Sequence, residues 1–145
     1  MKFTLSALAS AFLVGSTFAQ RTSIGFPFDG ATVQAGTNII VEIDRPNFLS
    51  GAEEVAVVLG LLHCPSVASC LPPEASLGTI LYNGPYDPEY HSNAPPSKPP
   101  HQNFTVAIPS TFVKGTAQLA AFHVSLVGAS RGPFTEINNI TVNVQ

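Results

Sequence analysis

The chain has 145 residues, 10% of them charged, and a formal net charge of −3 at pH 7. This length suits a single domain, and the absence of a basic stripe excludes nucleic acid and anionic membrane surfaces as expected partners. Thirteen prolines and many valine, isoleucine, threonine and phenylalanine residues favour strands joined by turns over helices.

The first nineteen residues have the pattern of a secretory signal peptide. Met1 and Lys2 supply the positive start, an apolar run follows, and small residues ending at Ala19 are typical of a cleavage site. The apolar run is too short to span a bilayer, and no second one follows. We therefore expect a secreted, extracellular protein without membrane insertion, with a signal peptide over residues 1–19 and one β-sandwich domain over residues 20–145.

Alternation of apolar and polar residues predicts seven strands in the mature chain. In chain order they cover Ser23–Phe26, Thr37–Asp44, Val55–Leu62, Gly78–Tyr82, Asn103–Ile108, Thr116–Val127 and Ile140–Val144. Val55–Leu62 is apolar on both faces, as expected for a central strand covered on each side. The pattern predicts an all-β fold, a single immunoglobulin-like antiparallel β-sandwich of about seven strands. The Cys–Trp–Cys signature of true immunoglobulin domains is absent, because the chain has no tryptophan.

The two cysteines follow the third predicted strand. Cys64 and Cys70 are separated by five residues, and in an extracellular protein we expect them to form a local disulfide. A redox-active pair would normally have the closer Cys-x-x-Cys spacing beside a helix start. Closing so short a loop should contribute about 2 kcal/mol at most.

One segment, Asn83–His101, interrupts the strand pattern. It holds six of the thirteen prolines, and proline cannot donate to a strand ladder. Two interpretations stay open: an extended connection between the sheets, or a functional loop. The tyrosines in and beside it either cover the open end of the sandwich or, if exposed, anchor a partner. The candidate partner-binding loop residues are Tyr82, Tyr86, Asp87, Tyr90 and His91.

The sequence contains no local motif for catalysis or metal binding. None of the four histidines lies in a His-x-His or His-Glu-x-x-His pattern; they are His63, His91, His101 and His123. Four side chains of the proline-rich segment would need a particular loop fold to gather around a cation: Asp87, Glu89, His91 and His101. We therefore expect no metal, no cofactor and no enzymatic activity.

Two other polar positions are interpreted as structural. His123 lies in the longest predicted strand, where a half-buried histidine is expected. Glu53 and Glu54 precede the strand that begins at Val55, and we interpret them as a solvated turn. Together with Asp44 they would otherwise be the carboxylates available for glycoside hydrolysis.

Two sequons predict N-glycosylation, at Asn103 and Asn139. If the residues that follow them, Phe104 and Ile140, point into the core, strand alternation directs both asparagines outward. Each site is therefore expected to be accessible.

Several stretches along the mature chain carry a resemblance to a known family. They are Asn47–Leu61 (NFLSGAEEVAVVLGL), Leu77–Pro85 (LGTILYNGP), Phe104–Ser110 (FTVAIPS) with Lys114–Ala117 (KGTA), and Ser125–Ser130 (SLVGAS) with Pro133 and Asn139–Val144 (NITVNV). In this order they resemble the necrosis-inducing secreted proteins of fungi, a family of small effectors. The resemblance implies a secreted, non-enzymatic protein that acts by binding, with no catalytic residues to transfer. It also implies a protein partner, namely host receptor-associated kinases, through which the protein would interfere with plant immune signalling, or a protein that induces cell death.

The resemblance is incomplete in two places, and it leaves a second function open. The Cys64–Cys70 loop and the segment Tyr86–His101 depart from the family pattern, which leaves the identity of the partner open. The opening stretch Ile24–Asn38 is also similar to the start of immunoglobulin-like domains in fungal wall-assembly proteins. The alternative is therefore a cell-wall or carbohydrate-associated module with a polysaccharide partner.

Overall fold

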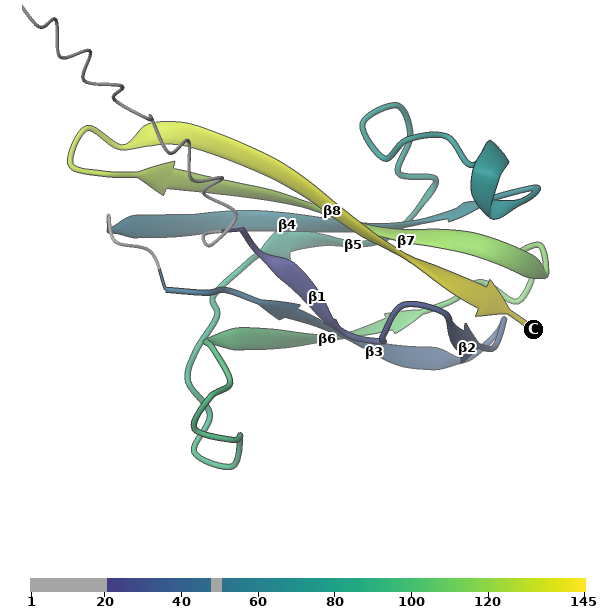
Figure 1. Cartoon of the computed structure of the whole chain (residues 1–145), viewed down its shortest axis with the longest axis horizontal. Coiled ribbons are helices and arrows are strands. Elements are labelled where there is room, and N and C mark those ends of the chain that lie inside the picture. The colour runs from purple at the N-terminus through teal and green to yellow at the C-terminus, as the bar shows by residue number, and fades with distance from the viewer. Residues whose placement is uncertain (1–20, 48–50) are drawn as a thin grey trace, which may run out of the picture.

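Two β-sheets pack face to face in the computed structural model, which describes residues 21–47 and 51–145 (Figure 1). The strands are β1 (Ser23–Phe26), β2 (Ala31–Val33), β3 (Asn38–Asp44), β4 (Ala52–His63), β5 (Thr79–Pro85), β6 (His101–Ala107), β7 (Gly115–Val127) and β8 (Gly132–Val144), with one 3₁₀ turn at Val67–Ser69. The smaller sheet has the order β1-β3-β6 and the larger the order β2-β8-β7-β4-β5. The predicted signal peptide lies outside the described residues.

The predicted all-β sandwich is confirmed, and each of the seven predicted strands corresponds to a strand of the structure. The immunoglobulin-like connectivity stays a prediction. Two differences concern the larger sheet: β2 was not predicted, and β8 begins at Gly132 instead of Ile140. β2 has only three residues, too few for a periodic pattern, and it pairs parallel to β8 whereas the other described pairs are antiparallel.

The long strands β4 and β7 form the centre of the larger sheet and supply much of the core. On β4 the inward side chains are Val57, Leu59 and Leu61, all at most 1% exposed. The expectation that both faces of this strand are covered is only partly met, since Val55 is 44% exposed. Over Gly60 the outer face is covered, because a Cβ there would lie 2.3 Å from the carbonyl oxygen of Leu77. Glycine therefore lets the connection between β4 and β5 cross directly over the strand.

The core between the sheets is apolar except near one end. It is built from valine, leucine, isoleucine and phenylalanine side chains of both sheets, but His123 of β7 is 1% exposed and lies among them. A buried histidine needs polar partners, and these partners lie at the end of the sandwich where the proline-rich connection begins.

Within residues 21–47 and 51–145, the structure contains no apolar helix of the length that a membrane span requires.

Candidate functional site

The proline-rich loop, residues 86–100, connects β5 of the larger sheet to β6 of the smaller sheet and projects from one end of the molecule (Figure 1). The prediction that Asn83–His101 contains no strand is wrong at its two ends. Asn83 to Pro85 extend β5, and His101 starts β6. Proline is tolerated at this position because β5 is an edge strand of its sheet.

The loop begins with a tyrosine that is part of the core. Tyr86 is 2% exposed, and its hydroxyl donates a hydrogen bond to the carbonyl oxygen of Ile43 at 3.1 Å. Its ring meets the ring of His123 edge-on, with centroids 5.3 Å apart. Burial raises the pKa of Tyr86 far above its ordinary value. The expectation that Tyr86 is an exposed contact residue is therefore corrected: it anchors the loop.

Tyr82 also serves as an anchor. Its ring packs against Phe104 with centroids 4.5 Å apart, and its hydroxyl donates to the carbonyl oxygen of Pro85 at 2.8 Å. The side chain is half-buried. For Tyr82 and Tyr86, the interpretation that tyrosines cover the open end of the sandwich describes the structure better than exposure does.

The other three predicted loop residues are exposed. Tyr90 is 65% exposed, and its hydroxyl lies 2.8 and 3.0 Å from the side-chain nitrogen and oxygen of Asn47. The backbone N–H of Asp87 donates to the side chain of Gln102 at 2.7 Å, which leaves its carboxylate at the surface. The His91 ring packs on His101 with centroids 4.5 Å apart. Asp87, Tyr90 and His91 are thus exposed on a loop that contacts Gln102, Asn47 and His101.

A buried ion network lies next to the Tyr86 anchor. Arg45 Nε donates to Glu54 Oε1 at 2.5 Å, and the other oxygen of Glu54 contacts His123 Nε2. The second ring nitrogen of His123 lies 3.0 Å from Glu136 Oε1, which also accepts the backbone N–H of Thr22 at 2.9 Å. The side chains of the four ionisable residues are at most 12% exposed. Two cations face two carboxylates, so the charges balance.

The pKa values of this network move in the directions that favour the charged forms. Burial lowers the pKa of His123, but hydrogen bonds to Glu136 and Glu54 outweigh burial and raise that pKa above its ordinary value. Burial raises the pKa values of Glu54 and Glu136, but bonds to His123, with further help from Arg45 and Thr22, outweigh it and lower them. The network is therefore fully charged at weakly acidic pH, and its burial makes its role structural.

The predicted position of Glu54 is wrong. This residue was expected in a solvated turn, whereas the structure places it inside β4 with its side chain directed inward. The cause is a β-bulge between Glu54 and Ala56 in the pairing of β4 with β7. A bulge inserts one extra residue and exchanges the two faces of the strand, so Val55 turns outward and Glu54 inward. Of the two glutamates expected in the turn, Glu53 is the solvated one, with a side chain 57% exposed.

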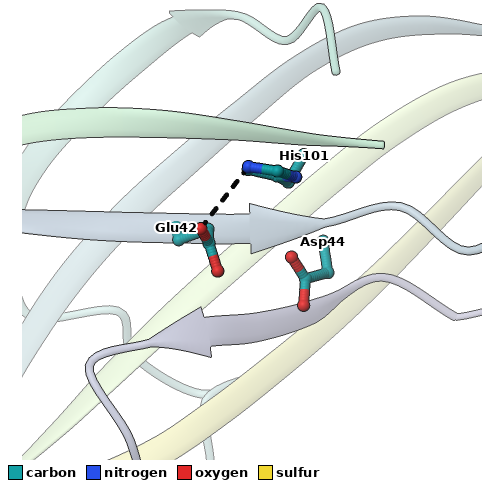
Figure 2. A group of neighbouring side chains, drawn as sticks. All are labelled: Glu42, Asp44 and His101. Atoms are coloured by element: carbon teal, nitrogen blue, oxygen red, sulfur yellow. Dashed lines mark ion pairs between the residues drawn. The ribbon is translucent and has the colours of Figure 1, made fainter. Parts of the chain in front are cut away.

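A second polar cluster lies on the outer face of the smaller sheet. Glu42 and Asp44 of β3 face outward beside His101 of β6, as Figure 2 shows. Lys98 of the proline-rich loop donates from Nζ to Glu42 Oε1 at 2.6 Å and to Asp44 Oδ2 at 2.9 Å. Glu42, Asp44 and His101 each offer one ligand atom within 4.8 Å of the others. The cluster therefore joins β3, β6 and the loop.

This cluster differs in its residues from a cation site formed within the proline-rich segment. Of Asp87, Glu89, His91 and His101, only His101 belongs to the cluster. Glu89 forms a β-bridge with His101 through the backbone, and His91 contacts the carbonyl oxygen of His101 at 3.2 Å. The sequence does show that Glu42 and Asp44 lie two residues apart in one strand and so share a face. It does not show their partners His101 and Lys98, which are remote in sequence.

The remaining predicted sites lie away from the loop or stay predictions. The disulfide Cys64–Cys70 is confirmed, with Cα atoms 4.7 Å apart. It encloses the 3₁₀ turn at the opposite end of the molecule (Figure 1). Asn103 and Asn139 are both exposed, and the Asn139 side chain donates to Gln118 at 3.2 Å. Glycosylation of these residues stays a prediction.

Comparison with known proteins identifies related sequences along almost the whole chain. The model of the Nis1 family matches residues 17–143. The chain is 31% identical over 147 residues to Necrosis-inducing secreted protein 1 of Colletotrichum orbiculare, covering 99% of this chain and 81% of the relative. It is also 31% identical to the protein of the same name from Colletotrichum higginsianum, covering 99% and 91%.

Among solved structures, two of the superoxide reductase (neelaredoxin) from Ignicoccus hospitalis are similar to this chain. The first covers 87% of this chain and 81% of its own, with a TM-score of 0.47 and 12% sequence identity. The second covers 84% and 80%, with a TM-score of 0.43 and 13% identity. A likeness at this level carries no information about activity.

Proposed function

The chain belongs to the Nis1 family, and we propose that it is an effector-like protein that induces cell death in host tissue by binding a host protein, without catalysis. The observation that carries this proposal is the 31% identity over 99% of the chain to two fungal relatives, each named as a necrosis-inducing secreted protein. Because these relatives are secreted proteins by name, the predicted extracellular location is confirmed.

We place the contact surface on the proline-rich loop, at Asp87, Tyr90 and His91. All three side chains are exposed, and Tyr90 offers a large amphipathic ring, the kind of group that anchors protein interfaces. The loop is held by Tyr86 in the core and by Lys98 on the outer face of the smaller sheet. A loop ordered before binding loses less conformational entropy when it binds. The expected partners, by family resemblance, include host receptor-associated kinases.

The proposal is tested with the mature chain from Gln20 onward, produced by eukaryotic secretion and applied to plant leaf tissue. The readouts are the elicitor-triggered oxidative burst and cell death. The loop variant carries Asp87→Ala, Tyr90→Ala and His91→Ala, and it retains Tyr86 because that side chain is in the core.

A second triple variant is the matched control. It carries Leu71→Ala, Glu74→Ala and Thr111→Ala, three exposed positions near the disulfide end of the molecule. We expect the wild type and the control variant to suppress the oxidative burst and to cause cell death. The loop variant is expected to do neither. Equal activity of the loop variant would place the contact surface elsewhere. Inactivity of the wild type together with its retention on chitin or glucan would favour the carbohydrate-associated alternative.

A further inference from the structure

The cluster on the outer face of the smaller sheet contains none of the proposed contact residues, although its bond to Lys98 holds the loop that carries them. Its geometry differs from that of an ordinary surface ion pair. Glu42, Asp44 and His101 offer ligand atoms within 4.8 Å of one another. In tetrahedral zinc sites with bonds of about 2.0–2.1 Å, ligand atoms lie about 3.3 Å apart. Small side-chain adjustments therefore bring the three atoms to metal-binding distance.

One carboxylate oxygen of the cluster is buried and unsatisfied. Asp44 is 9% exposed, and among the described residues its Oδ1 has no hydrogen-bond partner. A buried acceptor without a partner lowers stability, more so if it is charged. Lys98 does not relieve this cost, because its Nζ contacts the other oxygen, Oδ2. The Asp44 carboxylate lies beside Glu42 and His101 (Figure 2).

The imidazole of His101 is oriented as metal-binding histidines are. Its Nδ1 lies 2.9 Å from the carbonyl oxygen of Pro99, which can only accept, so Nδ1 carries a proton. The other nitrogen, Nε2, lies 3.6 Å from Glu42 Oε2, too far for a hydrogen bond. A ring nitrogen fixed to a backbone carbonyl leaves the opposite nitrogen for a metal ion. His101 is 6% exposed, so the ring is held in this orientation.

The backbone of β1 makes room for the two carboxylates. Gly25 faces them, and a Cβ at this position would lie 2.6 Å from Asp44 Oδ2 and 2.6 Å from Glu42 Oε1. Any other residue would push the carboxylates out of this arrangement. β1, β3 and β6 thus all contribute to one polar site on a rigid sheet, which is the support that a metal site needs.

We propose that Glu42, Asp44 and His101 bind one divalent transition-metal ion of the Zn²⁺ class, and that the ammonium group of Lys98 competes with this ion for the two carboxylates. One imidazole nitrogen and two carboxylate oxygens suit zinc and its neighbours, whereas Mg²⁺ and Ca²⁺ prefer oxygen ligands alone. Three protein ligands leave a fourth tetrahedral position for water or for a group of a partner. The proposal does not rest on the effector function, because it is argued from the cluster alone.

The test is calorimetric titration of the mature protein with zinc chloride, with magnesium chloride as the second ion. We expect one zinc ion per chain and no magnesium binding. Lys98→Met removes the competing cation and is expected to tighten zinc binding about tenfold or more. Because an unfolded chain can also bind zinc through its histidines, affinities are compared only between variants that are folded without zinc. Glu42→Gln keeps the shape of the side chain and is expected to weaken binding at least about tenfold.

Two controls decide between this site and an unrelated one. Glu53→Gln removes a solvated carboxylate of β4, and His91→Ala removes the neighbouring loop histidine; both variants are expected to bind zinc as the wild type does. The melting temperature of every variant without zinc identifies any that is misfolded. The proposal is overturned if Lys98→Met binds no zinc, or if binding is lost in His91→Ala and kept in Glu42→Gln.

Discussion

Replacing Glu54 by glutamine removes the central charge of the buried network and leaves its shape almost unchanged. The carboxylate lies between two cations, with Arg45 Nε at 2.5 Å and His123 Nε2 on its other oxygen. Its neighbour Glu53 provides a matched control, since the same substitution one residue earlier affects a side chain that is 57% exposed and pairs with Arg131 at 3.4 Å.

The two substitutions are expected to differ several-fold in cost. Removing one partner of a buried ion pair costs about 3–5 kcal/mol. For Glu54→Gln we expect the lower end, about 3 kcal/mol, because Arg45 keeps its bond to the carbonyl oxygen of Pro46 and His123 keeps Glu136. Glu53→Gln is expected to cost at most about 1 kcal/mol, as for exposed pairs. In a domain of this size the first loss lowers the melting temperature by about 10–15 °C.

The pH dependence of stability separates loss of the network from simple loss of packing. The folded protein holds the His123 proton more tightly than the unfolded chain does, because the pKa is raised. The stabilisation is therefore complete below the unfolded pKa of about 6.5 and is lost as pH rises through the folded pKa, at up to about 1.4 kcal/mol per pH unit. The pKa values of Glu54 and Glu136 are lowered, so the stabilisation that these carboxylates provide is lost as pH falls through their folded pKa values.

The assay is urea denaturation of the wild type and both variants between about pH 5 and pH 8.5, which spans the histidine titration. In Glu54→Gln the pKa of His123 is raised less than in the wild type. The unfolding free energy of this variant therefore stops declining at a lower pH than that of the wild type. The Glu53→Gln curve is expected to follow the wild type throughout. Equal losses in the two variants, or an unchanged pH profile in Glu54→Gln, would refute the assignment of a charged buried network.

Three further predictions concern the loop anchor, the disulfide and the sequons. Tyr86→Phe removes the hydroxyl that satisfies a buried carbonyl of β3 and should lower the unfolding free energy by about 1–3 kcal/mol; an unchanged denaturation midpoint would contradict this anchor. Replacing Cys64 and Cys70 together by serine should cost at most about 2 kcal/mol by loop-closure entropy, measured by the same denaturation, and a clearly larger cost would contradict that estimate. Asn103→Gln and Asn139→Gln should each remove one N-glycan from protein secreted by eukaryotic cells, seen by mass spectrometry; unchanged glycan content would mean that the sequon is unoccupied.

The proline-rich loop shows where sequence patterns stop being informative. Proline content identified a loop between two strands, and three of its candidate partner-binding residues, Asp87, Tyr90 and His91, are exposed in the structure. The sequence does not show that Tyr86 is buried and Tyr90 exposed, because both are tyrosines within the same proline-rich segment. The burial of Tyr86 depends on the position of His123 and Ile43, which are remote in the chain.

The sequence by itself determined the elements whose signal is local. Period-two alternation located seven strands, six residues of separation sufficed for the disulfide, and the order of family-like stretches identified the relatives. These features can be recognised without the tertiary structure, because alternation, short loops and sequence similarity are properties of neighbouring residues.

Tertiary structure decided everything that depends on register or on contact between sheets. The bulge beside Glu54 reversed the face of two residues, since a shift of one residue exchanges the two sides of a strand. The three-residue strand β2 exists only through its pairing with β8. Glu42, Asp44 and His101 meet because β3 and β6 pair in register, and Lys98 reaches them from the loop. Hydrogen bonds and charges act over a few ångströms in space, whatever the distance along the chain, and only the packed sheets bring these groups that close.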